Sequence, residues 1–269
     1  TSQLVTFHQV QVELQSPHKG WVEQDPQELL DSSITCINST VDMLKKLSVD
    51  PADIVSIGVT NQRETVVVWV GEVVAWWVMI IIFLQDCLTG SSLYPAIVWS
   101  DLRTRDMVTS LNMSFRSSMV QARSGLPIAT YFSAVKLRWL LDSQDNVAAA
   151  HYECRLLAGE APALHVLHTD PLLQASRTGL MNIHTQTWDT QLATFYGVPL
   201  NIMPRILASG DIFGMLEMTS LVGVNITGCM GTSKRQLWGT AAPVLACPRS
   251  PCFLLTNVGV RPIMSNSGL

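Results

Sequence analysis

The segment IGVTNQRET, residues 57–65, places polar side chains directly after an apolar stretch of chain. Residues 54–60 have the composition of a buried β-strand, and residues 65–70 form a second such strand. In open α/β sheets, ligands bind at the carboxyl ends of the strands, which is where residues 61–64 fall. The segment therefore predicts two strands with a candidate ligand site between them.

Helical patterns alternate with these strands along the chain. Asp25 and Pro26 are favoured at the start of a helix, and apolar residues follow them at spacings of three and four. This predicted core face comprises Leu30, Ile34, Ile37, Val41 and Leu44. Further helices are predicted over residues 101–111, 131–141 and 189–196, and further strands over 9–14 and 96–99. Strands and helices that alternate in this way predict an α/β fold.

The length and charge of the chain disfavour some classes of protein. With 269 residues it makes one large domain or two small ones. Its 17 basic and 21 acidic residues give a net charge of −4, whereas nucleic-acid-binding proteins are normally basic. The six cysteines are scattered, without a CxxC pair or a matched histidine spacing, so we expect no metal site and a reducing, cytoplasmic location. No sequence feature indicates an oligomeric state.

An apolar segment at residues 66–84 contains a single charged residue, Glu72. Its length is close to the roughly 18–20 residues that span a bilayer. We favour a buried strand followed by an apolar insertion, because Gly71 and Glu72 interrupt the segment and a carboxylate inside a bilayer costs about 2.5–3.5 kcal/mol. No cluster of Lys or Arg flanks the segment to orient it in a membrane. A membrane anchor is therefore the less favoured alternative.

The neighbouring residues Arg63 and Glu64 offer opposite hydrogen-bonding capacities. A guanidinium donates hydrogen bonds and a carboxylate accepts them, so the pair suits the hydroxyl groups of a small polyol, which do both. The aromatic rings of Trp99 and Tyr131 would cover the carbon side of such a ligand. The alternative is a surface turn that carries a solvated salt pair, which the local sequence supports equally well.

A series of segments, taken in order, resembles the glycerol kinases of the FGGY carbohydrate kinase family. The matching segments are Gly20–Pro26, Ile57–Thr65, Ile97–Thr104, Ser124–Pro127, Thr130–Leu141, Ala175–Thr178, Asn182–His184, Gly228–Gly231 and Cys252–Leu255. The resemblance implies a ribonuclease H-like, actin-like ATPase domain with a mixed sheet and flanking helices. We expect residues 1–269 to be the first of the family's two domains, incomplete at its N-terminus, with the C-terminal domain absent.

The same resemblance implies a substrate, a cofactor and a set of site residues. Glycerol would be bound by Arg63, Glu64, Trp99 and Tyr131, with Phe253 as a further aromatic wall. ATP and Mg²⁺ would be used to transfer the γ-phosphoryl group to a terminal hydroxyl of glycerol. Such a transfer needs positioning, charge neutralisation and a base for the hydroxyl proton.

The departures from the family pattern fall on the catalytic parts. Thr232 stands where the family has its catalytic Asp, and a Thr hydroxyl has no useful basicity near pH 7. Thr1 and Ser2 are the only remnant of the opening phosphate loop, and a shortened hairpin is expected after them. Residues 249–251 replace a glycine-rich phosphate loop, and Pro251 lacks an amide donor. We therefore expect a glycerol kinase-like protein impaired in catalysis; the alternative is a non-catalytic relative that acts as a binding or interaction protein.

The apolar segment also has a place in this comparison. Trp69 and the Leu88-Thr89-Gly90 sequence match the two ends of a short turn in the family, and residues 70–87 between them have no counterpart. We therefore interpret residues 70–87 as an insertion.

Overall fold

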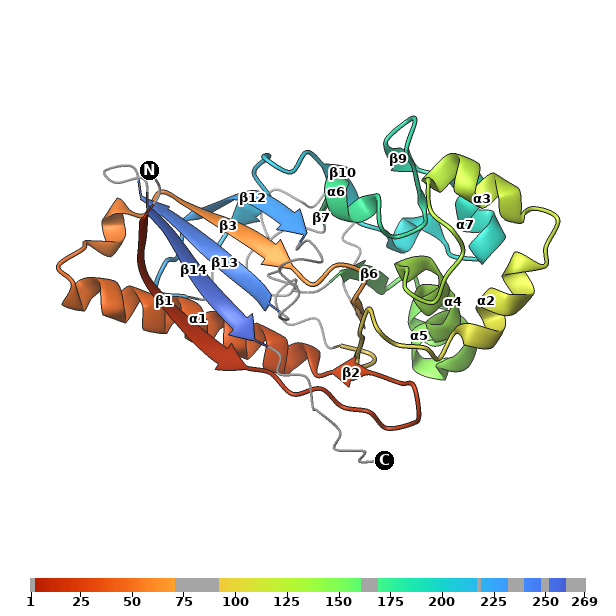
Figure 1. The fold of residues 1–269 in the computed structure, drawn as a ribbon, viewed down its shortest axis with the longest axis horizontal. Helices are drawn as coiled ribbons and strands as arrows, with labels where there is room; N and C mark the ends of the chain where they lie inside the picture. Colours follow the sequence, from red (N-terminus) through yellow and green to blue (C-terminus); the bar gives the residue numbers. More distant parts are fainter. Residues whose placement is uncertain are drawn as a thin grey trace, which may run out of the picture.

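A computed structural model describes residues 3–70, 92–160, 169–216, 219–231, 240–247 and 252–259 (Figure 1). The predicted α/β class is confirmed, because helices pack against two larger mixed or antiparallel sheets and two short strand pairs. Thr1, Ser2, Thr232 and most of the proposed insertion lie outside the described residues.

The elements follow one another along the chain with short connections. The helices are α1 (Pro26–Lys46), α2 (Arg105–Asn112), α3 (Ser117–Ser124), α4 (Ser133–Ser143), α5 (Asp145–Tyr152), α6 (Leu172–Ala175) and α7 (Thr190–Tyr196), with 3₁₀ turns η1 (Pro51–Asp53) and η2 (Leu200–Ile202). The strands are β1 (Gln3–Gln11), β2 (Glu23–Gln24), β3 (Ser56–Asn61), β4 (Val66–Val70), β5 (Ala96–Ile97), β6 (Leu156–Glu160), β7 (Thr169–Pro171), β8 (Met181–Asn182), β9 (Thr187–Trp188), β10 (Arg205–Leu207), β11 (Gly214–Met215), β12 (Asn225–Gly231), β13 (Thr240–Cys247) and β14 (Cys252–Gly259).

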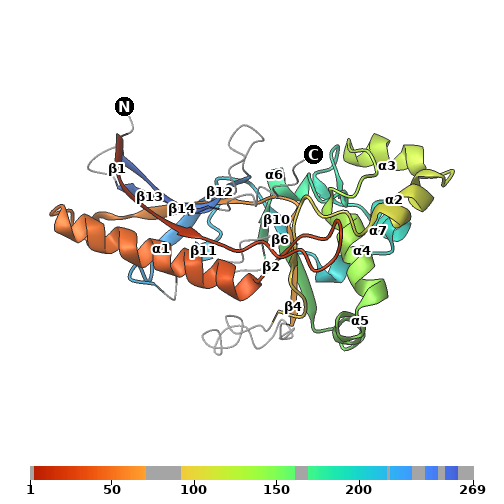
Figure 2. The same ribbon diagram turned by 60° about the horizontal axis from the view of Figure 1, so that its bottom comes forward.

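The larger sheet has six strands in the order β1-β14-β13-β3-β12-β11. The pairs β1–β14 and β3–β12 are parallel, and the other neighbours are antiparallel. Helix α1 runs along one face of this sheet, as Figures 1 and 2 show. Ile37 and Val41 of α1 pack there against Ile57 and Val59 of β3.

The second sheet has four strands in the order β2-β5-β4-β6. Strands β3 and β4 are consecutive in the chain but belong to different sheets, so residues 62–65 carry the chain from one sheet to the other. These are the polar residues that the sequence singled out. Their place between two sheets, rather than on a hairpin, decides the geometry of the candidate site.

Helix α1 begins where the sequence predicts, but its buried face is rotated from the predicted one. The Asp25 carboxylate caps the helix by accepting a hydrogen bond from the Gln27 amide at 2.8 Å. Leu30 and Ile34 are only half buried, because small residues let the helix approach its neighbours closely on the adjacent face. The buried side chains are Leu29, Ser32, Ser33, Cys36, Ile37, Thr40, Val41 and Leu44.

Two other predicted elements differ from the structure. The first strand spans Gln3–Gln11 rather than residues 9–14, and it pairs with β14 instead of forming a shortened hairpin. The helix predicted from Asp101 begins at Arg105. The Asp101 carboxylate accepts hydrogen bonds from the backbone amides of Val22 and Arg103, and such local bonds compete with helix formation.

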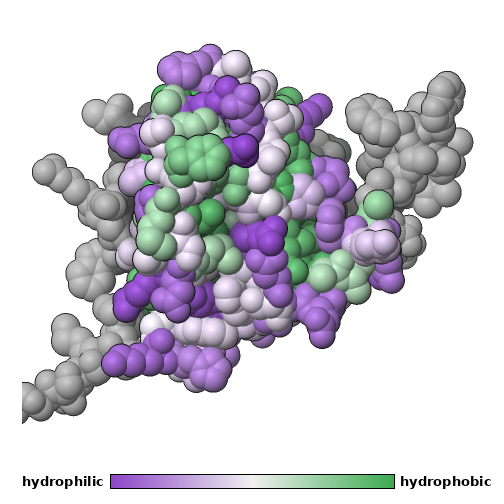
Figure 3. Space-filling view, turned by 90° about the vertical axis from the view of Figure 1, so that its right-hand side faces the viewer, coloured by the Kyte–Doolittle hydropathy of each residue, from purple (hydrophilic) through white to green (hydrophobic). Residues whose placement is uncertain are grey.

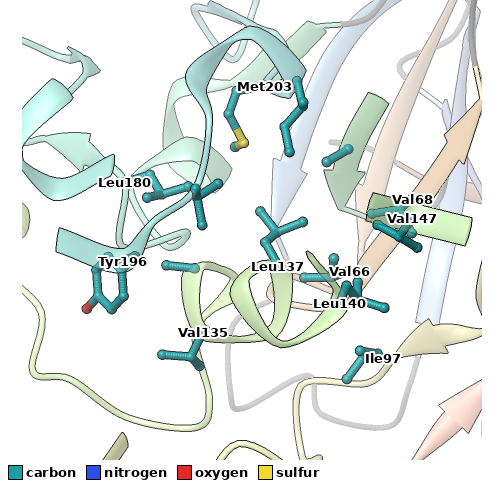
Figure 4. Packing of buried hydrophobic residues seen from close by; sticks show 14 of the residues in the cluster. Val66, Val68, Ile97, Val135, Leu137, Leu140, Val147, Leu180, Tyr196 and Met203 are labelled. Carbon is teal, nitrogen blue, oxygen red and sulfur yellow. The ribbon is translucent and has the colours of Figure 1, made fainter. Parts of the chain in front are cut away.

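The main hydrophobic core lies around α4, between strand β4 and helices α5 and α7. Figure 4 shows Leu137 and Leu140 of α4 on the side of the helix that meets Val66 and Val68 of β4. Because the turn at residues 62–65 leads directly into β4, this packing fixes the end of the turn against α4.

A buried ionic cluster around Arg103 joins β2, β5 and α4. The Arg103 guanidinium lies 2.8 Å from carboxylate oxygens of both Glu23 and Asp101, and its side chain is 0% exposed. It also stacks over the rings of Trp21 and Trp139, at 4.0 and 4.8 Å from their centroids. Although burial lowers it, the hydrogen bonds with the two carboxylates raise the pKa of Arg103 overall. The cluster holds in place the strand end that carries Trp99.

The described surface carries both apolar and polar residues. Within the described residues, no helix combines the length and the apolar character that a bilayer crossing requires. Figure 3 shows hydrophobic and hydrophilic residues intermixed over the face at the helical end of the molecule. Met113 and Phe115, which are 77% and 88% exposed, lie in the connection between α2 and α3. Exposed apolar residues at isolated positions are normal for a protein surface.

We predict that Arg103→Met destabilises the fold by about 3–5 kcal/mol, because it leaves two buried carboxylates without their cation. Urea unfolding followed by circular dichroism measures this change. As a control, Lys45→Ala removes the exposed ion pair with Asp42 and is expected to change stability by less than about 0.5 kcal/mol. Equal unfolding midpoints for the two variants would show that the cluster does not stabilise the fold.

Candidate functional site

The turn between the two sheets is held by its own side chains. The Gln62 side-chain amide donates hydrogen bonds to the Thr65 hydroxyl at 2.6 Å and to the side-chain oxygen Oε1 of Gln24 at 3.1 Å. The Thr65 hydroxyl in turn accepts a bond from the Trp99 backbone amide at 3.3 Å. Thr65 therefore ties the turn to the end of β5, where Trp99 lies.

Glu64 adopts a backbone conformation that is unfavourable for any residue with a side chain. Its φ is 61°, in the left-handed region that residues other than glycine rarely occupy. The residue is only 1% exposed, so its carboxylate points into the protein rather than into solvent. The turn thus presents Glu64 inward between the two sheets.

The Glu64 carboxylate is paired with Arg177, which follows helix α6. Arg177 Nε lies 2.7 Å from Glu64 Oε1. The Arg177 guanidinium also stacks over Phe132 and Tyr131, at 5.0 and 5.7 Å from the ring centroids. A cation with both an anionic and an aromatic partner is held in one orientation.

Tyr131 and Trp99 form an aromatic wall beside this ion pair. Their ring centroids are 5.7 Å apart at an interplanar angle of 61°. Burial raises the pKa of the Tyr131 hydroxyl, and the nearby negative charge of Glu64, with which the hydroxyl is hydrogen bonded, raises it further. The charges of Arg177 and Arg63 act in the opposite direction. Glu64, Tyr131 and both arginines therefore influence one another electrostatically.

The structure brings together four residues that the sequence predicted for the site. Glu64, Trp99 and Tyr131 are in contact through the bonds above, and half-buried Arg63 acts on Tyr131 through its charge. The alternative of a solvated surface pair is not what the structure shows, because Glu64 is buried and is paired with Arg177. We call Arg63, Glu64, Trp99, Tyr131 and Arg177 the Glu64 site.

The structure does not describe the side chains of the other predicted site residues. Phe253 lies in β14, opposite Leu4 of β1 and Ala246 of β13, but its side chain is outside the described part of the structure. Thr1, Ser2 and Thr232 lie outside the described residues altogether. Their proposed relation to phosphate and to catalysis stays a prediction.

Two residues of the site region were not assigned a role from the sequence. Arg177 follows a short helix, and Lys136 lies in the first turns of α4. Both fall within segments that carry the family resemblance, but a single cation at either position has no spacing pattern that marks it as part of a site.

The site has the donors and acceptors for a small polyhydroxyl ligand. The carboxylate accepts hydrogen bonds from hydroxyl groups, the guanidinium groups donate to them, and the rings offer apolar faces. Among the residues that the structure describes, no cluster of three or more His, Cys, Asp or Glu side chains is arranged to hold a metal ion. No described side chain is therefore assigned to Mg²⁺.

Comparison with known proteins places the chain among sugar kinases. The family model for the N-terminal domain of the FGGY family of carbohydrate kinases matches residues 1–73 and 79–231. A probable glycerol kinase from Caenorhabditis elegans is 36% identical over 281 residues, covering 100% of this chain and 53% of that protein. A glycerol kinase from Burkholderia vietnamiensis is 33% identical, covering 99% and 52%. The chain thus spans about half the length of the curated relatives it matches.

Solved structures agree with this comparison. The crystal structure of Plasmodium falciparum glycerol kinase with ADP superimposes with a TM-score of 0.71 at 28% identity, covering 82% of this chain and 42% of that one. Xylulose kinase from Rhodospirillum rubrum gives 0.65 at 21% identity, covering 82% and 42%, and shows likeness of fold alone. The actin-like ATPase fold expected from the sequence is confirmed.

We predict that Glu64→Gln lowers the pKa of Tyr131 toward its ordinary value of 10.0, because the negative charge that opposes phenol ionisation is removed while the two arginines remain. Absorbance of tyrosinate during an alkaline titration measures this, with Tyr131→Phe identifying the Tyr131 contribution. An unchanged Tyr131 titration in Glu64→Gln would contradict the contact between these two side chains.

Proposed function

The chain belongs to the FGGY family of carbohydrate kinases, and on that premise we propose that it binds glycerol at the Glu64 site. The observation that carries the proposal is the buried Glu64 carboxylate, held by Arg177 at 2.7 Å beside Tyr131 and Trp99. The glycerol kinases among its relatives support glycerol as the ligand.

Each part of the site has a role in this proposal. Glu64 accepts hydrogen bonds from neighbouring glycerol hydroxyls, and Arg63 donates to them. Trp99 and Tyr131 cover the carbon atoms and exclude water from that side. Phe253 is proposed as a further wall, because of its match to the family's aromatic residue.

We further propose that the chain is impaired in phosphoryl transfer. In the family reaction ATP, with Mg²⁺, supplies the γ-phosphoryl group that a glycerol hydroxyl accepts. That hydroxyl must lose a proton to a base, and Thr232 stands at the position that matches the family's catalytic Asp. The match of residues 249–251 to a phosphate loop is also incomplete. These substitutions support binding without efficient turnover.

A non-catalytic role as a binding or interaction protein is the second candidate. The same observation favours it, since a Thr at position 232 removes the base while the glycerol site retains its residues. A cytoplasmic location stays a prediction; it rests on the scattered cysteines, of which Cys36, Cys154 and Cys229 form no disulfide among the described residues.

We propose that residues 1–269 represent the N-terminal FGGY domain, with residues 70–87 as an insertion. The family match covers most of the chain, which supports the domain assignment, and its one break, at residues 74–78, lies inside the proposed insertion.

We predict that glycerol raises the melting temperature of the chain and that Glu64→Gln weakens glycerol binding about tenfold or more, because a hydrogen bond to a charged group is worth about 1.5–3 kcal/mol. Thermal shift and isothermal titration calorimetry measure the two effects. Lys45→Ala, whose side chain is exposed on α1, is expected to bind as the unmodified chain does. The absence of any glycerol-dependent shift would rule out this proposal.

We predict no glycerol-dependent ATP turnover above background, because a missing general base alone costs about 10²–10⁴ in rate. Formation of glycerol 3-phosphate from ATP and glycerol is the measurement. A clear burst of product from the purified chain would contradict impaired catalysis and leave glycerol binding intact.

A further inference from the structure

Lys136 is placed against the usual preferences of a lysine. It is 0% exposed, whereas lysine is almost never fully buried without partners for its charge. It also lies in the first turns of α4, where the helix dipole disfavours a cation. A residue that departs from both of these preferences is expected to have a structural or functional role that compensates for the cost.

Lys136 makes hydrogen bonds with two backbone carbonyl groups near the Glu64 site. Its Nζ donates hydrogen bonds to the backbone oxygen of Glu64 at 2.5 Å and to that of Tyr131 at 3.0 Å. These two carbonyls belong to different segments, the turn between the sheets and the loop before α4. One buried ammonium therefore joins the backbones of two residues whose side chains line the Glu64 site.

Lys136 contacts the backbone of Glu64, whose conformation is unfavourable. Glu64 has a φ of 61°, which is unfavourable for a residue with a side chain. The carboxylate of the same residue is engaged separately by Arg177. Lys136 thus acts on the main chain of Glu64 while Arg177 acts on its side chain.

The third segment of the site is attached to the same end of α4. The Ala134 amide donates a hydrogen bond to the Thr178 carbonyl oxygen at 2.8 Å, directly beside Arg177. The turn at residues 62–65, the Tyr131 loop and the Arg177 segment all meet at the N-terminus of α4.

We propose that Lys136 is a positioning residue, whose ammonium fixes the turn at residues 62–65 against the Tyr131 loop so that Glu64 and Tyr131 face one ligand. The effect on glycerol rests on the proposed function, whereas the positioning of the two segments does not.

Hydrogen exchange of the full chain tests the positioning. In Lys136→Met, which keeps the volume of the side chain and removes its donors, exchange in peptides covering residues 62–66 and 131–134 is expected to rise about tenfold or more, through local opening. Val147→Ala, which truncates a fully buried side chain of neighbouring α5, serves as the control. In this control, hydrogen exchange in the two segments is expected to rise no more than it does in the rest of α4.

Chemical rescue separates a specific donor from general packing. In Lys136→Ala, added n-propylammonium is expected to restore slow exchange at the turn, because it supplies N–H donors in the space left by the side chain. Tetramethylammonium at the same concentration has no N–H and is expected to restore nothing. If Lys136→Ala does not fold, the comparison of Lys136→Met with Val147→Ala decides the question.

Glycerol titration of the same variants completes the test. Lys136→Met is expected to bind glycerol about tenfold or more weakly, and Val147→Ala is expected to bind it normally. The proposal is overturned if Lys136→Met and Val147→Ala give the same exchange at the turn, or if both bind glycerol equally well. If the unmodified chain binds no glycerol but the exchange and rescue results hold, the proposed function fails and the positioning role stands.

Discussion

The buried ion pair between Glu64 and Arg177 is the interaction on which the candidate site depends. It joins the turn between the two sheets to a segment more than a hundred residues further along the chain. A charged carboxylate is costly to bury, and a cation at hydrogen-bonding distance offsets much of that cost. With the pair in place, Tyr131 and Trp99 stand beside a fixed acceptor, and the same turn continues into β4 at the centre of the main core.

In the proposed function, glycerol binding and phosphoryl transfer depend on different parts of the chain. Of the residues proposed for glycerol, Arg63 and Glu64 lie in the turn between the sheets, and Tyr131 lies before α4. Trp99 follows β5, and Phe253 lies in β14. The residues matched to phosphate and to the catalytic base lie at positions 1–2, 232 and 249–251. A change in the second group can therefore abolish turnover while the first group keeps its contacts, as an impaired or non-catalytic relative requires.

Much of the fold followed from local patterns, and the errors come from contacts between residues far apart in the sequence. Asp25 capped its helix as predicted, and the helix predicted over residues 189–196 is capped by Asp189, because an N-cap is decided within a few residues. The helix expected at Asp101 started later, because the Asp101 carboxylate is committed to the buried Arg103 cluster, which depends on distant residues. The first strand was misplaced because its partner, β14, comes from the other end of the chain.

The candidate site was predicted in part from the sequence. Arg63 and Glu64 are adjacent in sequence, and Trp99 and Tyr131 were proposed as the aromatic cover of their ligand; the family resemblance then implied the same four residues. Arg177 and Lys136 were not predicted, because their contacts with Glu64 span a long separation in the sequence and a single cation leaves no periodic signal. The central claim is tested most directly by a crystal structure of the chain with glycerol. The account predicts a glycerol hydroxyl within about 2.6–3.2 Å of the Glu64 carboxylate, with Arg177 still paired to it. Glycerol bound elsewhere, or a Glu64 side chain turned out into solvent, would contradict the account.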